Sequence, residues 1–448
     1  MEDTDATAAA RLASGLPLHA VIDISDAAAW TALDLDLREL ARTRPSALPR
    51  MSWATGRRFH WSWDAPLPTL DLRRREPDEP AIAVALCHAD GRIRETALRH
   101  AARLPAPALR PLLPLVAIRC ADWAEPVREP ARDLLRSALP GVGPGTADVL
   151  AAVVLRVAAR KYGDAAETLL EAALRESPAP VLDAVLASRD RATRRLAHRI
   201  AVERRHLSPE RLSESAATDP DLVIQDLCAA GTVARVTPSS AHELLAPLLR
   251  SPHGRVRSAG VTALRRAGRP QDAEAFLADR SALVRACARY VLRQSGVEAA
   301  PLYRELCAGD AVPGPAPLGL AECGTREDIA LLWPLTEHPV SGVRAHAVAG
   351  LRLLEATDLL RLLPLLDDPS PRVVRETVTA LVPWSERLPV DELRARLDAV
   401  ENPRHVRVGA FRLLAVAYAD DELCDLVSWL LFDEDDKLRA YAHATLCC

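Results

Sequence analysis

One short pattern recurs along most of this 448-residue chain. It consists of an apolar residue, an Arg, a small residue three positions after the Arg and usually an apolar residue seven positions after it. Copies stand at Ile93-Arg94, Val127-Arg128, Val256-Arg257, Val284-Arg285, Val343-Arg344, Val374-Arg375, Val406-Arg407 and Leu438-Arg439, with a weaker one at Thr193-Arg194. Successive copies lie 28 to 34 residues apart, and the larger gaps are close to two periods. A fixed period of this length predicts stacked repeat units, about twelve between residue 80 and the C-terminus.

The spacing within each copy is that of a helix. The residue before the Arg and those three, six and seven positions after it share one helical face, which we expect to be the buried seam of the second helix in a hairpin. Small residues at the third position let neighbouring helix axes approach to about 8–10 Å. Hydrophobic residues make up 49% of the chain and aromatic residues only 4%, which favours close-packed helices over sheets. The predicted fold class is all-α.

Turns rich in Asp, Pro, Ser or Gly precede most of these helices, as in Ser251-Pro252-His253-Gly254 and Asp433-Glu434-Asp435-Asp436. Such residues end one helix and cap the next. A turn with Asp, followed by Arg in the next helix, resembles the HEAT repeat of the HEAT-like and PBS-lyase-type families. The resemblance covers about four-fifths of the chain and implies an α-solenoid superhelix in which Asp and Arg lock neighbouring turns together. We therefore expect the recurrent arginines to be mainly structural.

The chain divides into two parts at about residue 75. Residues 76–448 are expected to form the HEAT-like repeat array, with irregularities near 139–145 and 311–317. Residues 1–75 do not fit the repeat and are predicted to be a divergent helical and aromatic capping segment, with a helix over 26–43. An alternative interpretation makes its aromatic and basic side chains a recognition surface, since Trp and Arg dominate binding hot spots; these residues are Trp53, Arg57, Arg58, Phe59, Trp61 and Trp63.

A second candidate surface follows from the positions four and eight residues after the recurrent Arg. These positions lie away from the seam, and in HEAT-like arrays the second helices line the concave surface. Cations recur there at Arg132, Arg136, His198, Arg265, Arg289, Arg293 and Arg352, and the stripe fades after Arg375. The alternative is a solvated face that nearby Asp and Glu neutralise. The net charge of −4 also argues against a nucleic-acid binder as a whole.

No catalytic motif is present: there is no glycine-rich phosphate loop, no G-x-S-x-G and no H-E-x-x-H. No cofactor and no metal are expected, because the histidines and cysteines do not pair at ligand spacing. The nine cysteines include no C-x-x-C and suit reduced, buried thiols. The acidic start lacks the features of a signal peptide, and no apolar run is long enough to span a bilayer. These features predict a soluble, cytoplasmic protein.

The sequence therefore predicts a non-catalytic scaffold or adaptor that presents a concave repeat surface to a protein partner. The alternative is a nucleic-acid-binding protein resembling the HEAT-like alkylpurine DNA glycosylases, although no motif residue transfers from them. A modifying factor of the bilin-lyase kind rests on fold analogy alone. The last unit has no polar capping helix after it, so we also expect the C-terminal repeat, with Trp429, to contact a second copy or the partner.

Overall fold

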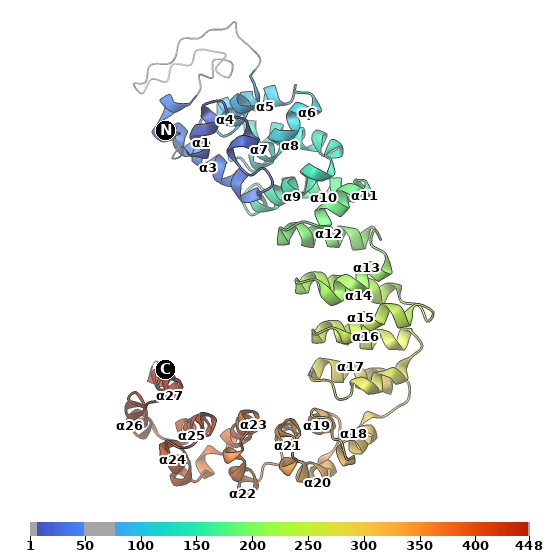
Figure 1. Cartoon of the computed structure of the whole chain (residues 1–448), viewed down its shortest axis with the longest axis vertical. Coiled ribbons are helices and arrows are strands. Elements are labelled where there is room, and N and C mark those ends of the chain that lie inside the picture. Colours follow the sequence, from blue (N-terminus) through green and yellow to red (C-terminus); the bar gives the residue numbers. More distant parts are fainter. Residues whose placement is uncertain (1–6, 49–76, 447–448) are drawn as a thin grey trace. The chain divides into compact units, whose positions relative to one another are not determined.

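The computed structural model describes residues 7–48 and 77–446, and every regular element within these ranges is a helix. The prediction of an all-α chain is confirmed (Figure 1). The chain separates into two compact units, whose boundary falls within residues 216–231. The part of the chain that the structure describes holds no helix long and apolar enough to cross a membrane.

The N-terminal part contributes three helices, which pack on the first repeats. They are α1 (Ala8–Ala13), α2 (Leu18–Val21) and α3 (Ala27–Thr43), followed by the 3-10 turn η1 (Pro45–Ala47). The helix expected over 26–43 is therefore confirmed, and Asp26 caps it by accepting the Ala28 N–H. Helix α3 lies against α7 and α9. Residues 49–76, including the aromatic and basic positions 53–63, lie outside the described residues.

After residue 76 the described helices fall into twelve consecutive pairs, in which we distinguish the first helix from the second helix. The pairs of unit 1 are α4 (Glu79–Leu86) with α5 (Gly91–Ala101); α6 (Ala106–Leu109), η2 (Arg110–Leu112) and α7 (Leu113–Arg119) with α8 (Glu125–Ala138); α9 (Pro144–Ala158) with α10 (Asp164–Glu176); and α11 (Ala179–Leu186) with α12 (Arg191–Glu203). The 3-10 turn η3 (Leu139–Gly141) precedes α9, and the pair α13 (Pro209–Thr218) and α14 (Leu222–Arg235) contains the unit boundary.

Unit 2 continues the same arrangement. Its pairs are α15 (Ala241–Arg250) with α16 (Gly254–Arg266); η4 (Pro270–Phe276) with α17 (Ala282–Arg293); α18 (Ala299–Ala308) with α19 (Ala316–Ala321); η5 (Arg326–Asp328), α20 (Ile329–Leu332) and η6 (Pro334–Glu337) with α21 (Ser341–Leu353); α22 (Leu359–Leu362) and η7 (Leu363–Asp367) with α23 (Pro371–Leu381), which η8 (Val382–Arg387) extends; α24 (Val390–Asp398) with α25 (Arg404–Ala417); and α26 (Asp420–Leu430) with α27 (Asp436–Leu446).

Within each unit the first helices and the second helices form separate layers. In unit 1, α4, α7, α9 and α11 follow one another in one layer, and α5, α8, α10 and α12 follow one another in the other. In unit 2, α16 packs on α17, α19 on α21, and α23 on both α21 and α25, on the inner side of the bend of this unit (Figure 1). Each unit is thus a HEAT-like α-solenoid, as the repeat pattern predicts.

The seam positions are buried as predicted in most second helices. Val284, Ala288 and Leu292 are fully buried in α17, and Ala347 is fully buried in α21. Burying small side chains here brings the helices together, and Gly350 leaves room for the Pro317 carbonyl oxygen, which would lie 3.1 Å from an added Cβ. The continuous core of each unit is therefore the row of seams between its two layers.

One detail of the repeat differs from the prediction. In α23 the predicted seam residues Val374 and Val378 are buried, together with Val373, Thr377 and Leu381. Arg375, however, is exposed and does not occupy the place of the other recurrent arginines. The apolar run near Val154 lies in α9, which packs between the first helices α7 and α11, so the pair of α9 and α10 fills part of the gap between Arg128 and Arg194. Both α9 and α23 carry apolar residues on more than one face.

Candidate functional site

Most turns between a first and a second helix begin with a side chain that accepts the backbone N–H two residues later. We refer to this residue as the turn acceptor. The accepting atom lies 2.7 to 3.2 Å from that nitrogen in nine turns, at His88, Asp122, Ser188, Asp219, Ser251, Asp279, His338, Asp368 and Asp433. Asp, Ser and His can each fill this position because each has an acceptor atom close enough to bond the N–H two residues later. This hydrogen bond fixes the backbone just before the second helix begins.

The recurrent arginine stands six residues after the turn acceptor and joins two turns. Arg257 donates from Nη1 to the carbonyl oxygens of Ser251 (2.8 Å) and Pro252 (3.0 Å), which belong to its own turn. Its Nε and Nη2 donate to the two carboxylate oxygens of Asp279, the next turn acceptor, at 2.8 and 2.7 Å. We refer to this two-sided arrangement as the clasp.

The clasp recurs in both units. Arg94 binds the carbonyl oxygens of residues 88 and 89 and both oxygens of Asp122, and Arg344 binds those of residues 338 and 339 and both oxygens of Asp368. Variants of it join Arg285 to Glu322 and Arg407 to Asp433. The expectation that these arginines are mainly structural is confirmed.

Within the clasp, the carboxylates stay ionised and paired with the arginines. Burial works to raise the pKa of Asp279, but the hydrogen bonds from Arg257 and from the Ser281 N–H outweigh it, and the pKa of this carboxyl lies below its ordinary value. The same balance, burial against the hydrogen bonds from Arg407, lowers the pKa of Asp433. A clasp arginine is therefore paired and largely buried, and is not free to meet a partner.

Two of the predicted site residues are also occupied inside the array. Arg132 donates to the carbonyl oxygens of Cys120 (3.2 Å) and Tyr162 (2.8 Å) and pairs with Glu129. Arg289 pairs with Glu322 at 2.5 Å, so two guanidinium groups share that carboxylate. Arg136 is exposed but pairs with Asp133 on its own helix. These three arginines, two from unit 1 and one from unit 2, are not brought together at one free surface.

His198 is buried in α12, with a ring nitrogen 2.9 Å from the Arg194 carbonyl oxygen. The other three predicted cations lie in unit 2 at one repeat position. Arg265, Arg293 and Arg352 each stand eight residues after a clasp arginine, near the C-terminal ends of α16, α17 and α21. All three are exposed, and none forms a hydrogen bond or ion pair with another described residue. We refer to them as the arginine row. Arg266 and Arg412 are likewise exposed and unpaired among the described residues, and the sequence analysis missed both.

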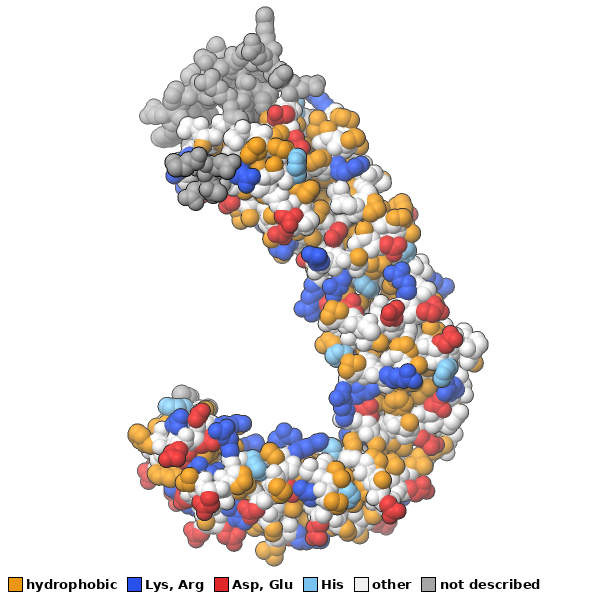
Figure 2. All heavy atoms as spheres, viewed as in Figure 1, with side chains coloured by type: hydrophobic (Ala, Val, Ile, Leu, Met, Phe, Trp, Pro, Cys, Tyr) orange, Lys and Arg blue, Asp and Glu red, His pale blue; other side chains and the backbone are white. Residues whose placement is uncertain are grey.

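The two layers of unit 2 carry opposite charge. Within α16, α17, α19, α21, α23 and α25, Glu376 is the single carboxylate, whereas each of these helices except α19 carries at least two arginines. The carboxylates gather on the first-helix side, at Glu243, Asp272, Glu274, Glu305, Glu327, Glu337, Asp367, Asp391, Glu392, Asp398, Asp420, Asp421, Glu422 and Asp425. Figure 2 shows basic side chains along the inner side of unit 2 and acidic ones along the outer side.

Exposed apolar side chains stand beside the open cations. Tyr290 precedes Arg293 by one helical turn, Leu353 follows Arg352 directly, and Val416 lies one turn after Arg412. These residues protrude from the same helices as the cations. The second-helix face of unit 2 therefore exposes positive charge and apolar side chains together.

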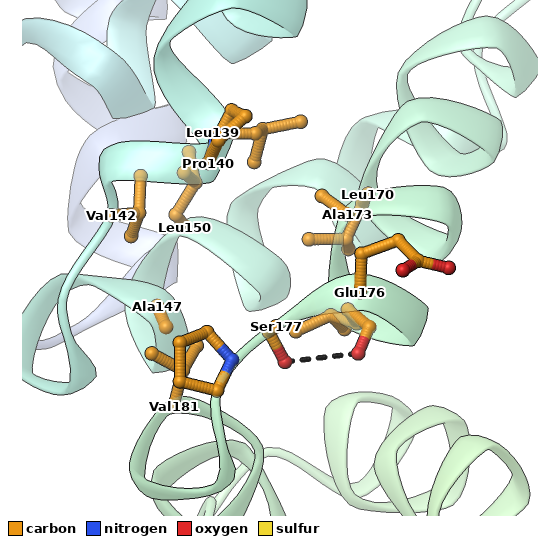
Figure 3. Close-up of a pocket in the computed structure, with 12 residues that line it drawn as sticks. Leu139, Pro140, Val142, Ala147, Leu150, Leu170, Ala173, Glu176, Ser177 and Val181 are labelled. Atoms are coloured by element: carbon orange, nitrogen blue, oxygen red, sulfur yellow. Dashed lines mark hydrogen bonds between the residues drawn. The ribbon is translucent and has the colours of Figure 1, made fainter. Parts of the chain in front are cut away.

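Unit 1 contains a small apolar pocket between η3, α9, α10 and α11 (Figure 3). Its volume is about 120 Å³, and Leu139, Leu150, Leu170 and Val181 line it. The Ser177 hydroxyl donates to the Leu174 carbonyl oxygen at 2.9 Å, so this polar group on the lining is already bonded. Ligand pockets usually measure about 300–1,000 Å³, and this one is smaller.

Burial raises the pKa of Cys120 and of Cys228 to about 12, so both remain protonated. Among residues 7–48 and 77–446, no three His, Cys, Asp or Glu side chains are grouped to hold a metal ion.

Comparisons with known proteins identify similar folds only. No family model matches the chain, and no curated protein sequence matches it. Among solved structures, the karyopherin Kap121p bound to Nup53p is similar with 15% identity and a TM-score of 0.32, over 81% of this chain and 48% of that one. A Kap95p structure described with RanGDP gives 12% identity and a TM-score of 0.44, over 98% of this chain and 66% of that one. The chain thus spans about half the length of Kap121p, and nothing about partners is transferred at these scores.

Proposed function

We propose that this chain is a non-catalytic binding scaffold, and that the second-helix face of unit 2 receives a protein partner. The observation that carries the proposal is the separation of charge between the two layers of unit 2. Positive side chains without a partner stand in a row on one layer, and the carboxylates that would neutralise them stand on the other.

This arrangement costs free energy in the isolated chain. Neighbouring second helices are about 10 Å apart, which is close to the Debye length at physiological salt, so their exposed arginines repel one another weakly. Each pair of unit charges at that distance costs about 0.4 kcal/mol in water before screening. Placing Arg at the end of a helix recovers about 0.3–1 kcal/mol from the helix dipole, but this explains one cation at a time and not the lack of carboxylates across the layer.

The N-terminal part is proposed to cap the first repeats and to add to recognition. Helix α3 is fixed to the array by Asp34, which pairs with Arg119, and both side chains are buried. The segment with Trp53, Arg57, Arg58, Phe59, Trp61 and Trp63 follows this helix closely in the chain. It is proposed as a second contact for the same partner.

The test compares affinity capture by three forms of the full chain. The face variant carries Arg265→Glu, Arg293→Glu and Arg352→Glu. The control variant carries Arg250→Glu, Arg326→Glu and Arg361→Glu, three changes of the same sign on the first-helix elements α15, η5 and α22. A partner retained by the wild type and the control but lost by the face variant supports the proposal, and equal retention by all three contradicts it.

Nucleic acid is the alternative ligand for the second-helix face, and the same variants distinguish it from a protein partner. Binding that neutralises phosphates releases counterions, so the affinity for DNA would fall steeply as salt rises. Binding of a 20-base-pair duplex that is strong at physiological salt and lost in the face variant would replace the protein partner with nucleic acid.

A further inference from the structure

The arginine row has a regular geometry. Arg265 and Arg293 lie on second helices of adjacent pairs, whereas one pair, α18 with α19, stands between Arg293 and Arg352. Helices packed through small residues are about 10 Å apart, so the two intervals along the row are about 10 and 20 Å. All three side chains occupy the same repeat position, and the row therefore runs across the helices rather than along one of them.

An extended peptide matches these intervals. In the polyproline II form it rises about 3.1 Å per residue with three residues per turn, so residues three apart and six apart point the same way and are separated by about 9 and 19 Å. A helical peptide lying along the row would need its carboxylates about seven and fourteen residues apart to match these intervals, so the spacing of the carboxylates distinguishes the two forms.

We propose that the arginine row binds an extended acidic segment of a partner protein, with carboxylates separated by three and then six residues and apolar side chains between them. This proposal rests on the scaffold function and specifies the ligand class of the same surface. Arg is suited to the task because its planar group donates two parallel hydrogen bonds to one carboxylate. Tyr290 and Leu353, exposed beside Arg293 and Arg352, provide the apolar contacts between the charged ones.

The observations favour such a segment over duplex nucleic acid. A duplex is a long polyanion whose charge continues beyond the row, where it meets a chain with a net charge of −4. The acidic first-helix layer repels it at low salt, where screening is weak. A short peptide confined to the second-helix face avoids that repulsion, and its apolar residues gain contacts that phosphates cannot use.

The experiment measures fluorescence anisotropy of labelled synthetic peptides with the full chain at low and at physiological salt. The first peptide has three glutamates at the proposed spacing with leucines between them, and the second has the same composition with the glutamates adjacent. We expect the spaced peptide to bind at least tenfold more tightly than the clustered one. Arg293→Glu with Arg352→Glu should weaken its binding tenfold or more, and the control Arg250→Glu with Arg326→Glu less than twofold.

Equal affinity for the two peptides would overturn the extended geometry, and tighter binding of a DNA duplex than of either peptide would overturn the ligand class. Failure of both peptides, together with a captured partner that depends on the arginine row, would refute this inference and leave the scaffold function standing. Failure of both the peptides and the capture would refute both. Circular dichroism and hydrogen exchange of α16, α17 and α21 show whether each variant is folded.

Discussion

The clasp arginine is the residue on which the array most depends. Arg257 satisfies two carbonyl oxygens of its own turn and the carboxylate of the next turn, so a single side chain holds two consecutive pairs in register. The recurrence of Arg made this residue predictable from the sequence. Its acceptor was harder to predict, because Asp, Ser and His share the turn position and only the observed hydrogen bonds show that they are equivalent.

Removing one side of a clasp should be costly. Asp279→Ala leaves the largely buried guanidinium of Arg257 without its counter-charge, and we expect a loss of about 3 kcal/mol in the free energy of unfolding. Asp279→Asn keeps an acceptor for the Ser281 N–H and should lose about 1–2 kcal/mol. Urea denaturation followed by circular dichroism measures both. The control Asp272→Ala removes a partly exposed pair with Arg269 and should change stability by less than about 1 kcal/mol.

Buried histidines should make the array sensitive to mild acid. Burial, followed by the neighbouring charge of Arg372, lowers the pKa of His346, whose Nε2 lies 2.6 Å from Arg372 Nη2. The unfolded chain therefore binds a proton near pH 6.5 that the folded chain does not, and stability decreases as the pH falls below about 7.

Thermal melts at pH 7.5 and 5.5 should show this decrease, and His346→Asn should reduce it by up to about 1.4 kcal/mol per pH unit. His198, whose pKa burial also lowers, should retain its own contribution in that variant. An unchanged difference between the two melting temperatures in His346→Asn would show that the proton is bound elsewhere.

At the scale of the helix, the repeat period predicted the pairing but not every register. In α23 the sequence offers Val374 and Val378 beside Val373 and Thr377, so two adjacent faces are apolar and the helical wheel does not choose between them. In α9 the apolar run from Leu150 to Val157 fits either layer, and only its packing on α7 and α11 identifies it as a first helix. Such choices are made by contacts between helices, which a single period does not encode.

Alanine substitutions at two glycines would measure how closely these helices pack. An added Cβ at Gly319 in α19 would lie 2.3 Å from the Tyr303 ring, which is held by its hydroxyl on the Leu277 carbonyl oxygen. Gly319→Ala should therefore destabilise the array by about 1–3 kcal/mol. A Cβ at Gly342 in α21 meets nothing within 4 Å, and Gly342→Ala should stabilise it by about 0.5–1 kcal/mol.

Both variants are measured by urea denaturation. Gly→Ala raises helix propensity at both positions, so a loss of unfolding free energy in Gly319→Ala and a gain in Gly342→Ala would separate the effect of packing from that of propensity. If Gly319→Ala were neutral, the ring of Tyr303 would have to move freely, and exchange of the α18 amides would then increase.

At the scale of the whole chain, the proposed binding surface was predictable only in part. Counting eight residues from each recurrent Arg found Arg265, Arg293 and Arg352. It did not find Arg412, which stands five residues after its clasp arginine. The companion count of four residues included Arg132 and Arg289, which are bonded inside the array. The contrast between layers was not visible beforehand, because it requires knowing which helix of each pair is first.

The C-terminal pair is predicted to associate with another chain. Trp429 in α26 is 44% exposed under Arg394, and Phe432, three residues on, is 88% exposed. Contiguous apolar patches of this kind often mark association sites. Light scattering of the isolated chain should show a mass that rises with concentration. Trp429→Asp with Phe432→Ser should abolish that rise.

The control for this prediction is Leu360→Ser, which removes a single side chain of 84% exposure in α22. It should leave the association unchanged, because one isolated apolar residue buries little area. A strictly monomeric wild type at high concentration would exclude self-association through this pair.

The charge separation in unit 2 affects how the chain adsorbs to charged surfaces. Its second-helix layer carries an excess of arginine and its first-helix layer an excess of carboxylate, so the unit is an electric dipole across its thickness although the whole chain carries a net charge of −4. A negatively charged resin should therefore retain it by one face at neutral pH, and a positively charged resin by the other. A protein of negative net charge is not expected to bind a negatively charged resin. A protein whose two sides carry opposite charge can bind resins of both signs.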